Sequence, residues 1–493
     1  MTMLAISTLL LVSGSLASAP IDIGSRLEPL VDDYLIERLD GAVLALHEPV
    51  PREVAIVHDA PWEGETSAFH TVFQDGDVYR MYFRGSGRGA RRGKLMERHH
   101  WSNERTCYAE SRDGIHWTRP ELGLFEFQGS KANNIVWEGP GAHNFAPMKD
   151  TNPACKPEQR YKALAFMHCE KALAEGRRVR LLYAFQSADG LRWSLMQPEP
   201  VITNGAFDSL NVASWDAVRG RYVAFVRKNR PGPVPRDIGT ATSPDFIHWT
   251  DTTWLEYPGS APAEMYTNAI APYDRAPHIF FGFPMRYMGT RDHRRGDETG
   301  YGLTDVVFIT SRDGLNFHRW DEALIRPGLQ RDRWVSRRNL TARGLPVTRS
   351  DVHGGPELSL YSTEGYAYSP LDKMENDAGR LRRFTIRVDG FVSVRAGSKG
   401  GEMVTKPLVF SGDRLQLNLS TSAAGSIRVE IQDASGTPIP GFALGDCPEI
   451  FEDRLDHVVN WKQGHDLSRL SGKSVRLRFV LNDADLYSMR FTE

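Results

Sequence analysis

Short stretches in which apolar and polar residues alternate run along most of this chain, separated by turns rich in Gly, Pro and Asp. Residues 68–85 are the clearest example, because two alternating segments flank the turn Asp75-Gly76-Asp77. Alternation with a period of two is typical of strands with one buried face, and an Asp-Gly pair between two such strands predicts a hairpin. Only short segments show helical periodicity, so the pattern predicts an all-β protein.

A seven-residue motif recurs among these predicted strands. Its copies are SRDGIHW (111–117), SADGLRW (187–193), SPDFIHW (243–249), SRDGLNF (311–317) and the weaker RVDGFVS (387–393). The aspartates of successive copies are 76, 56, 68 and 76 residues apart. A unit that repeats at this spacing, with strands on both sides, is typical of radial β architectures. Five copies predict a five-bladed β-propeller, which we place at residues 20–401.

The pattern changes at about residue 402, where alternating strands continue without the motif. The segments RLQLNLSTS, GSIRVEIQD and SVRLRFVL are separated by turns that contain Gly, Pro and Asp. Strands at this spacing predict a separate β-sandwich domain over residues 402–493.

The motif itself has the composition of a turn. Its Ser and Asp side chains can bond backbone N–H groups of a tight turn, and its Gly tolerates a positive φ angle. Its Trp or Phe can return to pack between neighbouring sheets. We therefore assign the motif to structure rather than catalysis. Phe246 replaces the Gly in the third copy, so we expect a different turn there.

The position of the motif in a blade predicts where function lies. If the motif joins the third and fourth strands of an antiparallel blade, it lies at one face of the propeller. The innermost strands then begin at the opposite face, where the loops between second and third strands also lie. We expect the functional site at that opposite face, around the central channel.

Carboxylates stand at or just before the predicted innermost strands, one in each blade. They are Glu65, Asp150, Asp208, Glu264 and Glu357. Any one of them is more often an ordinary turn or capping residue, but one per blade favours function, above all for Asp150, Asp208 and Glu264. Several carboxylates in a water-filled cleft suit glycosidic bond cleavage, in which one carboxyl protonates the leaving oxygen while another attacks the anomeric carbon or activates water. Retaining and inverting mechanisms both remain open.

Basic residues follow the predicted second strands of three blades. They are Arg84, Arg88, Arg91, Arg92, Lys94 and Arg98 in blade one, Arg227, Lys228, Arg230 and Arg236 in blade three, and Arg286, Arg291, Arg294 and Arg295 in blade four. Guanidinium groups at the mouth of a channel suit carboxylate or sulfate groups on a substrate. Charged loops that serve only solubility are the alternative.

With these residues in place, the chain resembles the five-bladed β-propeller glycoside hydrolases of families 32, 43 and 68, and more distantly family 130. The resemblance covers roughly residues 30–400 and rests on the five motifs, on KDTNP (149–153) and on the order Asp, Asp, Glu in successive blades. KDTNP looks like the R-D-P motif of family 32, whose Asp stabilises the transition state, and members of that family carry a C-terminal β-sandwich. The N-D-P-N-G and E-C motifs of that family are absent. The chain is also similar to uncharacterised secreted propeller proteins of planctomycete-type bacteria.

The resemblance implies two competing assignments of the catalytic residues. In the first, Asp150 is the base or nucleophile, Glu264 is the acid, and Asp208 modulates the pKa of that acid. In the second, Asp150 is the stabiliser, Glu65 lies in the nucleophile's blade and Asp208 takes the place of the acid. We prefer the first because it keeps the residue types.

The predicted substrate-binding residues lie beside these carboxylates or in the basic loops. They are Asn152, Asn211, Tyr266, His70, Arg84, Arg227, Arg286 and Glu357. A carbohydrate is the expected partner, and no metal or other cofactor is predicted. Three other functions stay open, namely a carbohydrate-binding propeller without catalysis, a sialidase-like enzyme, and a lyase that uses Tyr266, His70 or His353 as its base.

Composition and the N-terminus limit the setting in which the protein works. The net charge of −2 gives no bulk attraction to nucleic acid or membrane. Residues 1–19 are typical of a secretory signal, with the apolar run LAISTLLLV before Ala17-Ser18-Ala19, so we expect a secreted or periplasmic protein; a wrongly assigned start is the alternative. Four cysteines are too few for a disulfide framework, although Cys155 and Cys169 could pair across a predicted hairpin rather than stay free.

Overall fold

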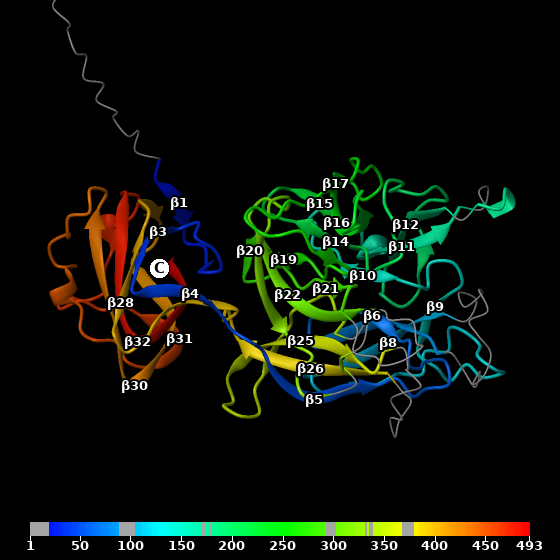
Figure 1. The fold of residues 1–493 in the computed structure, drawn as a ribbon. Coiled ribbons are helices and arrows are strands. Elements are labelled where there is room, and N and C mark those ends of the chain that lie inside the picture. Colours follow the sequence, from blue (N-terminus) through cyan, green and yellow to red (C-terminus); the bar gives the residue numbers. More distant parts are fainter. Residues whose placement is uncertain are drawn as a thin grey trace, which may run out of the picture. The chain divides into compact units, whose positions relative to one another are not determined.

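The computed structural model describes residues 19–87, 104–169, 173–177, 179–291, 302–330, 333–334, 339–366 and 379–493. The chain forms two units, whose elements are labelled in Figure 1. One unit is Leu44–Ser393, and the other joins Val394–Glu493 to the N-terminal residues that end at Val43. None of the helices in the described ranges is long and apolar enough to cross a membrane.

The unit Leu44–Ser393 is the predicted five-bladed β-propeller, built from antiparallel sheets. Blade one consists of β6 (Ala68–Asp75), β7 (Val78–Gly85), β8 (Arg105–Ser111) and β9 (Ile135–Glu138). Blade two consists of β10 (Ala146–Lys149), β11 (Tyr161–His168), β12 (Arg180–Ser187) and β13 (Ser194–Leu195), with the short 3-10 helix η2 (Pro157–Gln159) between β10 and β11. Blade three consists of β14 (Val212–Asp216), β15 (Arg221–Asn229), β16 (Arg236–Ser243) and β17 (Thr253–Trp254).

Blades four and five depart from the simple four-stranded plan. Blade four contains β19 (Ala271–Tyr273), β20 (Ala276–Gly282), β22 (Leu303–Ser311) and β23 (His318–Ile325), and it is extended by β18 (Glu264–Met265) and β21 (Met285–Met288). Blade five contains β24 (Val347–Arg349), β25 (Pro356–Glu364) and β26 (Arg380–Arg387), followed by β5 (Val50–Val57) as its outermost strand. The beginning of the chain therefore closes the ring of blades.

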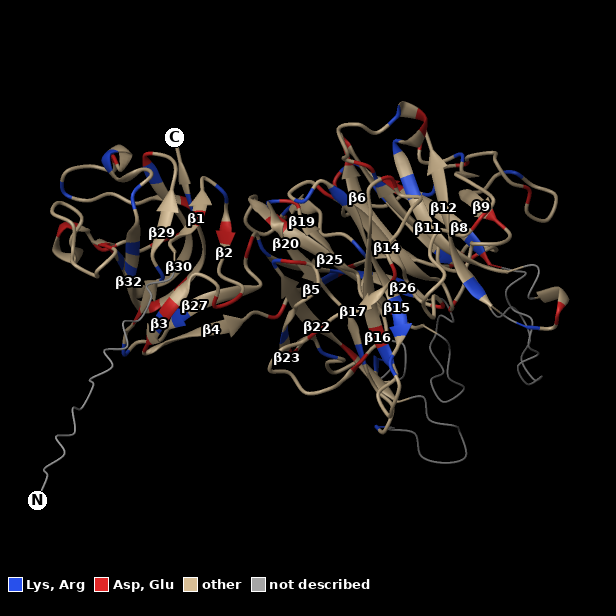
Figure 2. Cartoon of the chain, turned by 90° about the horizontal axis from the view of Figure 1, so that it is seen from above, with Lys and Arg blue, Asp and Glu red and all other residues tan. Residues whose placement is uncertain are grey.

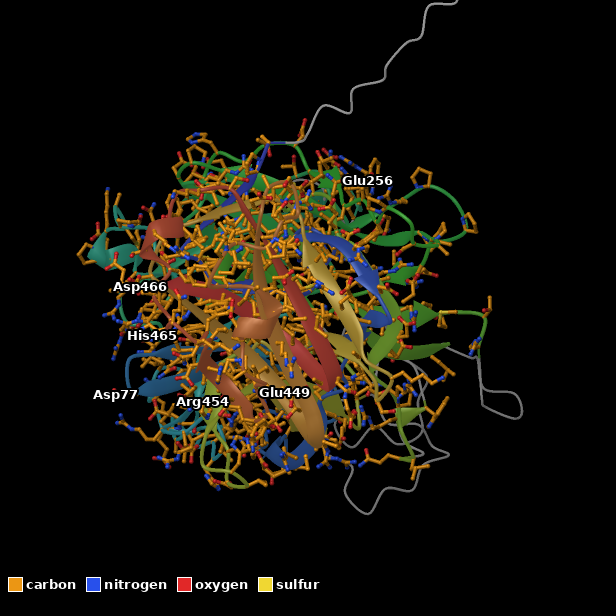
Figure 3. All side chains as sticks on the ribbon, turned by 90° about the vertical axis from the view of Figure 1, so that its left-hand side faces the viewer. Asp77, Glu256, Glu449, Arg454, His465 and Asp466 are labelled. Carbon is orange, nitrogen blue, oxygen red and sulfur yellow. The ribbon has the colours of Figure 1, made fainter. Side chains whose placement is uncertain are left out.

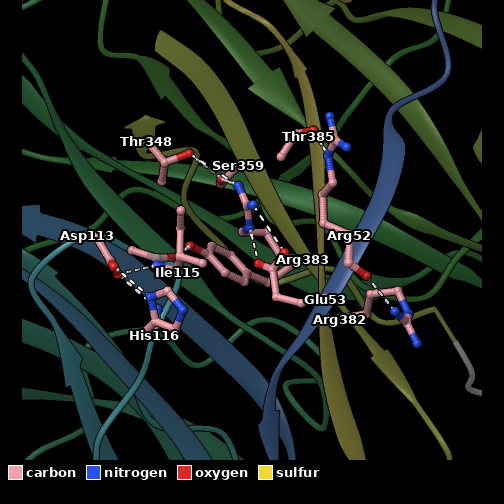
Figure 4. A network of polar contacts seen from close by, with 12 residues as sticks. Arg52, Glu53, Asp113, Ile115, His116, Thr348, Ser359, Arg382, Arg383 and Thr385 are labelled. Atoms are coloured by element: carbon pink, nitrogen blue, oxygen red, sulfur yellow. Dashed lines mark hydrogen bonds and ion pairs between the residues drawn. The ribbon is translucent and has the colours of Figure 1, made fainter. Parts of the chain in front are cut away.

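A buried ion-pair network holds β5 against its blade (Figure 4). Arg383 on β26 pairs with Glu53 on β5, and its Nη1 donates to Glu357 Oε1 at 2.9 Å. The side chain of Arg383 is buried, so its charge is neutralised by these two carboxylates rather than by water. The sequence pattern did not reveal this closure, because strand 50–57 lies more than three hundred residues from its partner.

The recurrent motif forms the turn between the third and fourth strands, as predicted. In its first copy, Ser111 Oγ accepts a hydrogen bond from the N–H of Gly114 at 2.9 Å, and Asp113 Oδ1 accepts from the N–H groups of Ile115 and His116 at 2.8 Å each. The second, third and fourth copies repeat these bonds. Burial alone would raise the pKa of Asp113, but its hydrogen bonds, led by the one from His116, hold it well below its usual range. The turn is thus a structural unit, which confirms that assignment.

The third copy uses the same turn despite its Phe, so the expectation of a different turn is wrong. Phe246 has a φ of +72°, close to the +73° of Gly114, and its N–H bonds Ser243 Oγ at 2.9 Å. Its ring is fully buried between Tyr222 and Trp249. Burial of a large ring is worth about 1.5–3 kcal/mol, which offsets the strain of a left-handed backbone at a non-glycine residue.

The fifth copy has another role. Asp389 is buried and accepts hydrogen bonds from the Tyr273 hydroxyl and from Arg275 Nε, the latter at 2.9 Å. Both partners belong to blade four, so this aspartate joins blades four and five.

The second unit is a ten-stranded β-sheet. Its strands are β1 (Ile21–Gly24), β2 (Glu28–Pro29), β3 (Ile36–Asp40), β4 (Ala42–Leu46), β27 (Val392–Ala396), β28 (Gly401–Thr405), β29 (Leu408–Phe410), β30 (Arg414–Asp433), β31 (Asp453–Val458) and β32 (Val475–Thr492). The short 3-10 helices η4 (Leu444–Asp446) and η5 (Ser468–Leu470) lie in its loops. Figure 3 labels several polar residues of this unit, among them Glu449, which pairs with Arg428 at 2.7 Å.

This sheet shows where the domain boundary differs from the expected one. We placed residues 20–401 in the propeller and a sandwich at 402–493, whereas strands β1 to β4 pair with the C-terminal strands. A β-sheet does occupy the C-terminal range, and the two-layered sandwich stays a prediction.

Candidate functional site at the face opposite the turns

The propeller has two distinct faces. We call the end that carries the Ser-Asp-Gly turns the turn face, and the end where the innermost strands begin the opposite face. Asp208 precedes β14, Glu65 precedes β6, and Glu264 pairs with Tyr287 near the end of β21. These three candidate carboxylates therefore lie at the opposite face, where we expected them.

Asp150 lies at the turn face, so the expectation that it shares a face with Asp208 is wrong. It follows the innermost strand β10 rather than preceding it, and its N–H bonds the carbonyl of Arg160 at the start of the next strand. Its carboxylate contacts Lys162 Nζ and accepts the Tyr222 hydroxyl at 2.7 Å. Asn152 donates to the same hydroxyl at 3.1 Å, so it also belongs to this link between blades two and three.

Glu357 also lies at the turn face. The innermost strand of blade five is β24, and Glu357 stands near the beginning of the second strand, β25. Its carboxylate is buried, with Oε1 at 2.9 Å from Arg383 Nη1. His353, the remaining candidate for a lyase base, lies in the loop between these strands and is at the turn face too.

Asp208 is the best-placed carboxylate for a ligand. Its side chain is 30% exposed, with Arg227 Nη1 at 2.5 Å from Oδ1 and Arg180 Nη1 at 3.7 Å from Oδ2. The guanidinium of Arg227 also lies over the ring of Tyr266, at 4.8 Å from its centroid. Asp208 thus joins blades two and three through guanidinium contacts while one edge stays open to solvent.

Glu264 lies in a similar arrangement in blade four. Its Oε2 is 2.5 Å from Arg236 Nη1. The guanidinium of Arg236 lies 4.6 Å from the ring centroid of Tyr287 and 5.8 Å from that of Tyr266. Tyr266 therefore contacts the arginines of both carboxylates and links Asp208 to Glu264.

Arg84 is the centre of a third group at this face. Its Nη2 donates to the Tyr366 hydroxyl at 3.0 Å, and its Nη1 lies 3.4 Å from Glu104 Oε1 and 3.0 Å from His143 Nδ1. His143 Nδ1 is also 2.8 Å from Glu104 Oε2. Blades one, two and five thus meet around one buried guanidinium.

Sequence reasoning did not name Glu104, His143 or Tyr366. His143 stands shortly before the innermost strand β10, as Asp208 stands shortly before β14. A prediction that began this strand at Ala146 would therefore have identified His143 as a candidate. Burial lowers the pKa of His143 to about 4, and Arg84 adds to this, while the hydrogen bond with Glu104 opposes it. The imidazole is therefore neutral at neutral pH.

A pocket of about 730 Å³ adjoins Asp208. Arg180, Arg227, Lys228 and Trp254 line it together with the backbone of 203–206. Burial lowers the pKa of Lys228, although Asp251 opposes this, and its Nζ lies 4.4 Å from the ring centroid of Trp254. Arg227 and Lys228 lie on β15 and Arg236 begins β16, and Figure 2 shows segments of Lys and Arg in blue near these two strands. Three cationic side chains against one carboxylate give this pocket a positive charge.

The remaining predicted residues are less accessible. Asn211 is fully buried, and its amide bonds the carbonyls of Phe207 and Ser209 at 2.9 and 2.8 Å, so it positions the segment that carries Asp208. His70 is buried with its Nε2 at 3.1 Å from His58 Nε2. Arg286 pairs with Asp305 at 2.6 Å.

Several expected basic residues lie outside the described ranges. They are Arg88, Arg91, Arg92, Lys94, Arg98, Arg294 and Arg295.

The described part of the chain contains all four cysteines. All four cysteines are free. Cys155 and Cys169 lie near opposite ends of β11, whose eight residues separate them by roughly 26 Å, so the possible disulfide between them does not form. Within the described ranges, no cluster of His, Cys, Asp and Glu could hold a metal ion.

Comparisons with known proteins show similarity in fold only. No protein-family model and no curated protein matches the sequence. Among solved structures, an N-acetylgalactosamine deacetylase from F. plautii in complex with blood group B trisaccharide matches with a TM-score of 0.44 and 13% identity, over 70% of this chain and 95% of that one. A family 43 arabinoxylan arabinofuranohydrolase from Bacillus subtilis gives 0.42 and 11%, over 90% and 99% of the two chains. A family 32 β-fructofuranosidase from Bombyx mori gives 0.41 and 9%, over 91% and 94%. Similarity this low does not transfer an activity.

Proposed function

We propose that the protein is a secreted or periplasmic glycoside hydrolase that acts on a glycan bearing carboxylate or sulfate groups. The pocket at Asp208 carries this proposal, because it combines a partly exposed carboxylate, three cations and the indole of Trp254. Cations recognise acidic substituents, and an aromatic ring offers an apolar surface to a sugar ring. Asp208 and Glu264 are the candidate catalytic pair.

The positions of the carboxylates change the proposed roles. Because Asp150 is at the other face, Asp208 takes the role of base or nucleophile and Glu264 that of the acid. Proton donation by Glu264 requires its ion pair with Arg236 to open when substrate binds. Glu65 is at the same face and is the third candidate.

A carbohydrate-binding propeller without catalysis is the second candidate function. One observation favours it: Asp208, Glu264 and Glu104 each contact an arginine guanidinium. Carboxylates held in this way can accept sugar hydroxyls without any proton transfer.

The test is a screen of the full chain against acidic, sulfated and neutral polysaccharides, with release of reducing ends and binding measured in parallel. We expect cleavage of an acidic or sulfated polymer, with loss of cleavage and retained binding in Glu264→Gln. Asp77→Asn is the control, because Asp77 is exposed in the turn between β6 and β7, at the turn face (Figure 3). Binding without cleavage by the wild type would support the non-catalytic function, and neither binding nor cleavage would contradict both.

Export rests on residues 1–19, of which 1–18 lie outside the described ranges. We expect a chain expressed with its own N-terminus to leave the cytoplasm and to begin at Pro20 after processing. N-terminal sequencing of the exported protein checks this, and an unprocessed cytoplasmic chain would contradict it.

A further inference from the structure

A second cavity lies at the turn face, on the side of the propeller away from Asp208. Its volume is about 520 Å³, and residues of all five blades line it. The innermost strands or their ends contribute Phe73, Lys149, Trp215, Tyr273 and Val347. A cavity lined by all five innermost strands is the turn-face end of the central channel.

Arg343 brings a charge into this largely apolar cavity. The residue is 9% exposed, and its Nη2 donates to the carbonyl of Ala213 at 3.0 Å and to Ser214 Oγ at 2.7 Å. Its buried Nε has no hydrogen-bond partner. Among the described residues, no carboxylate forms an ion pair with this guanidinium. Ala213 and Ser214 thus fix a guanidinium that lines the cavity and whose hydrogen-bonding capacity is only partly used.

The other charged residues of the cavity have partners of their own. Lys149 Nζ is 2.8 Å from Asp75 Oδ1, and Arg275 Nε is 2.9 Å from Asp389 Oδ1. Asp274 lines the same cavity and attracts Arg343 without forming an ion pair with it. Burial lowers the pKa of Arg343 to about 10, and the charge of Asp274 opposes this. A buried cation without a paired anion is costly, so a protein that keeps one gains stability when an anion binds.

We propose that this cavity binds a small organic carboxylate with an aromatic body. The carboxylate would pair with the guanidinium of Arg343, and the ring would lie against Phe73, Trp215 and Phe281. Such a site has the usual features of a small-molecule pocket: a volume of about 300–1,000 Å³, mostly apolar walls and few convergent polar groups. It is separate from the site at Asp208 and does not depend on the proposed glycosidase activity.

The test is a fluorine NMR titration of the full chain with para-fluorobenzoate and with the neutral para-fluorobenzyl alcohol. We expect the carboxylate to bind about tenfold or more tightly than the alcohol, because a charge-assisted hydrogen bond is lost with the alcohol. Equal affinity for the two probes, or no binding of the carboxylate, would overturn the proposal.

Variants locate the binding. Arg343→Met should weaken para-fluorobenzoate by about tenfold or more, and Asp274→Asn should tighten it by about threefold, since a competing negative charge is removed. Lys149→Gln is the matched control, a cation of the same cavity that is already paired with Asp75, and should weaken binding by no more than about threefold, the size expected for one charge that does not contact the probe. If Arg343→Met does not fold, Ala271→Phe fills the cavity with Arg343 intact and should abolish binding. Unchanged affinity in folded Arg343→Met, or in Ala271→Phe, would overturn the proposal.

Discussion

The two faces of the propeller use carboxylates in different ways. At the turn face, Asp150 is buried against Lys162 and Tyr222, and four of the five motif aspartates accept N–H groups of their own turns. At the opposite face, Asp208 and Glu264 contact guanidinium groups that also lie over Tyr266, and Asp208 keeps 30% of its side chain exposed. The side chains of Asp113, Asp189 and Asp245 are 40–46% exposed, so exposure alone does not separate the faces. The partners separate them, because backbone N–H groups of one turn hold each motif aspartate, whereas Asp208 contacts guanidinium side chains beside a pocket.

The largest effect expected at the turn face concerns stability. Asp150→Asn leaves the ammonium of Lys162 buried and without its carboxylate, which should lower the free energy of unfolding by about 3–5 kcal/mol. Urea denaturation measures this. The double variant Asp150→Asn with Lys162→Met removes both charges and should recover most of the loss. If the single variant is as stable as the wild type and instead loses ligand binding, the contrast between the faces fails.

An effect of intermediate size is expected in the pH dependence of stability, which should differ between the two faces. His143 at the opposite face has a folded pKa of about 4 against 6.5 unfolded, mainly through burial, so the unfolded chain binds more protons between these values. Stability should therefore fall by about 2 kcal/mol as the pH drops from 6.5 to 4. His143→Phe should remove that part of the pH dependence. An identical slope in wild type and variant would show that His143 takes up its proton in the folded protein.

The turn face should lose stability at a lower pH than the opposite face. Burial alone would raise the pKa of Asp245, but hydrogen bonds, led by that from the N–H of His248, lower it to about 2. The stability it provides is present above pH 3.8 and is lost as the pH falls toward 2. Acid unfolding of His143→Phe, followed by circular dichroism, should retain this transition and lack the earlier one.

The smallest expected effect concerns a single turn. Asp113→Ala removes the acceptor of two N–H groups and should cost about 1 kcal/mol, by analogy with the loss of a helix cap. Urea denaturation measures it, with Asp77→Asn as the exposed control. If Asp113→Ala lost activity without losing stability, the motif would have a functional role, which would contradict the proposed difference between the faces.

The local chemistry of the motif explains why the fold could be predicted. The Ser and Asp side chains of the motif accept backbone N–H groups that lie within the same seven residues, and one residue of the turn has a positive φ angle. These local bonds fix the turn wherever the motif occurs. Phe246 shows that the Gly of the motif can be replaced. Pairing between distant strands leaves no such local sign. The closure of blade five by β5, and the pairing of β1 to β4 with the C-terminal strands, were therefore missed.

The candidate site was predicted only in part, because short strands carry little periodicity. The innermost strands β10 and β24 have four and three residues. Alternation over so few residues does not show whether a carboxylate precedes or follows the strand, and Asp150 and Glu357 were assigned to the wrong face. The group of Arg84, Glu104, His143 and Tyr366 assembles from three blades and has no signature along the sequence.

The central claim is that glycan cleavage belongs to the opposite face, at Asp208. The most direct measurement is kcat/KM on a polymer that the wild type cleaves, for Asp208→Asn and Asp77→Asn at equal folded concentration. We predict a loss of about a hundredfold or more for Asp208→Asn, as expected when an acid–base group is removed, and no change for Asp77→Asn. Full activity in Asp208→Asn would contradict the claim.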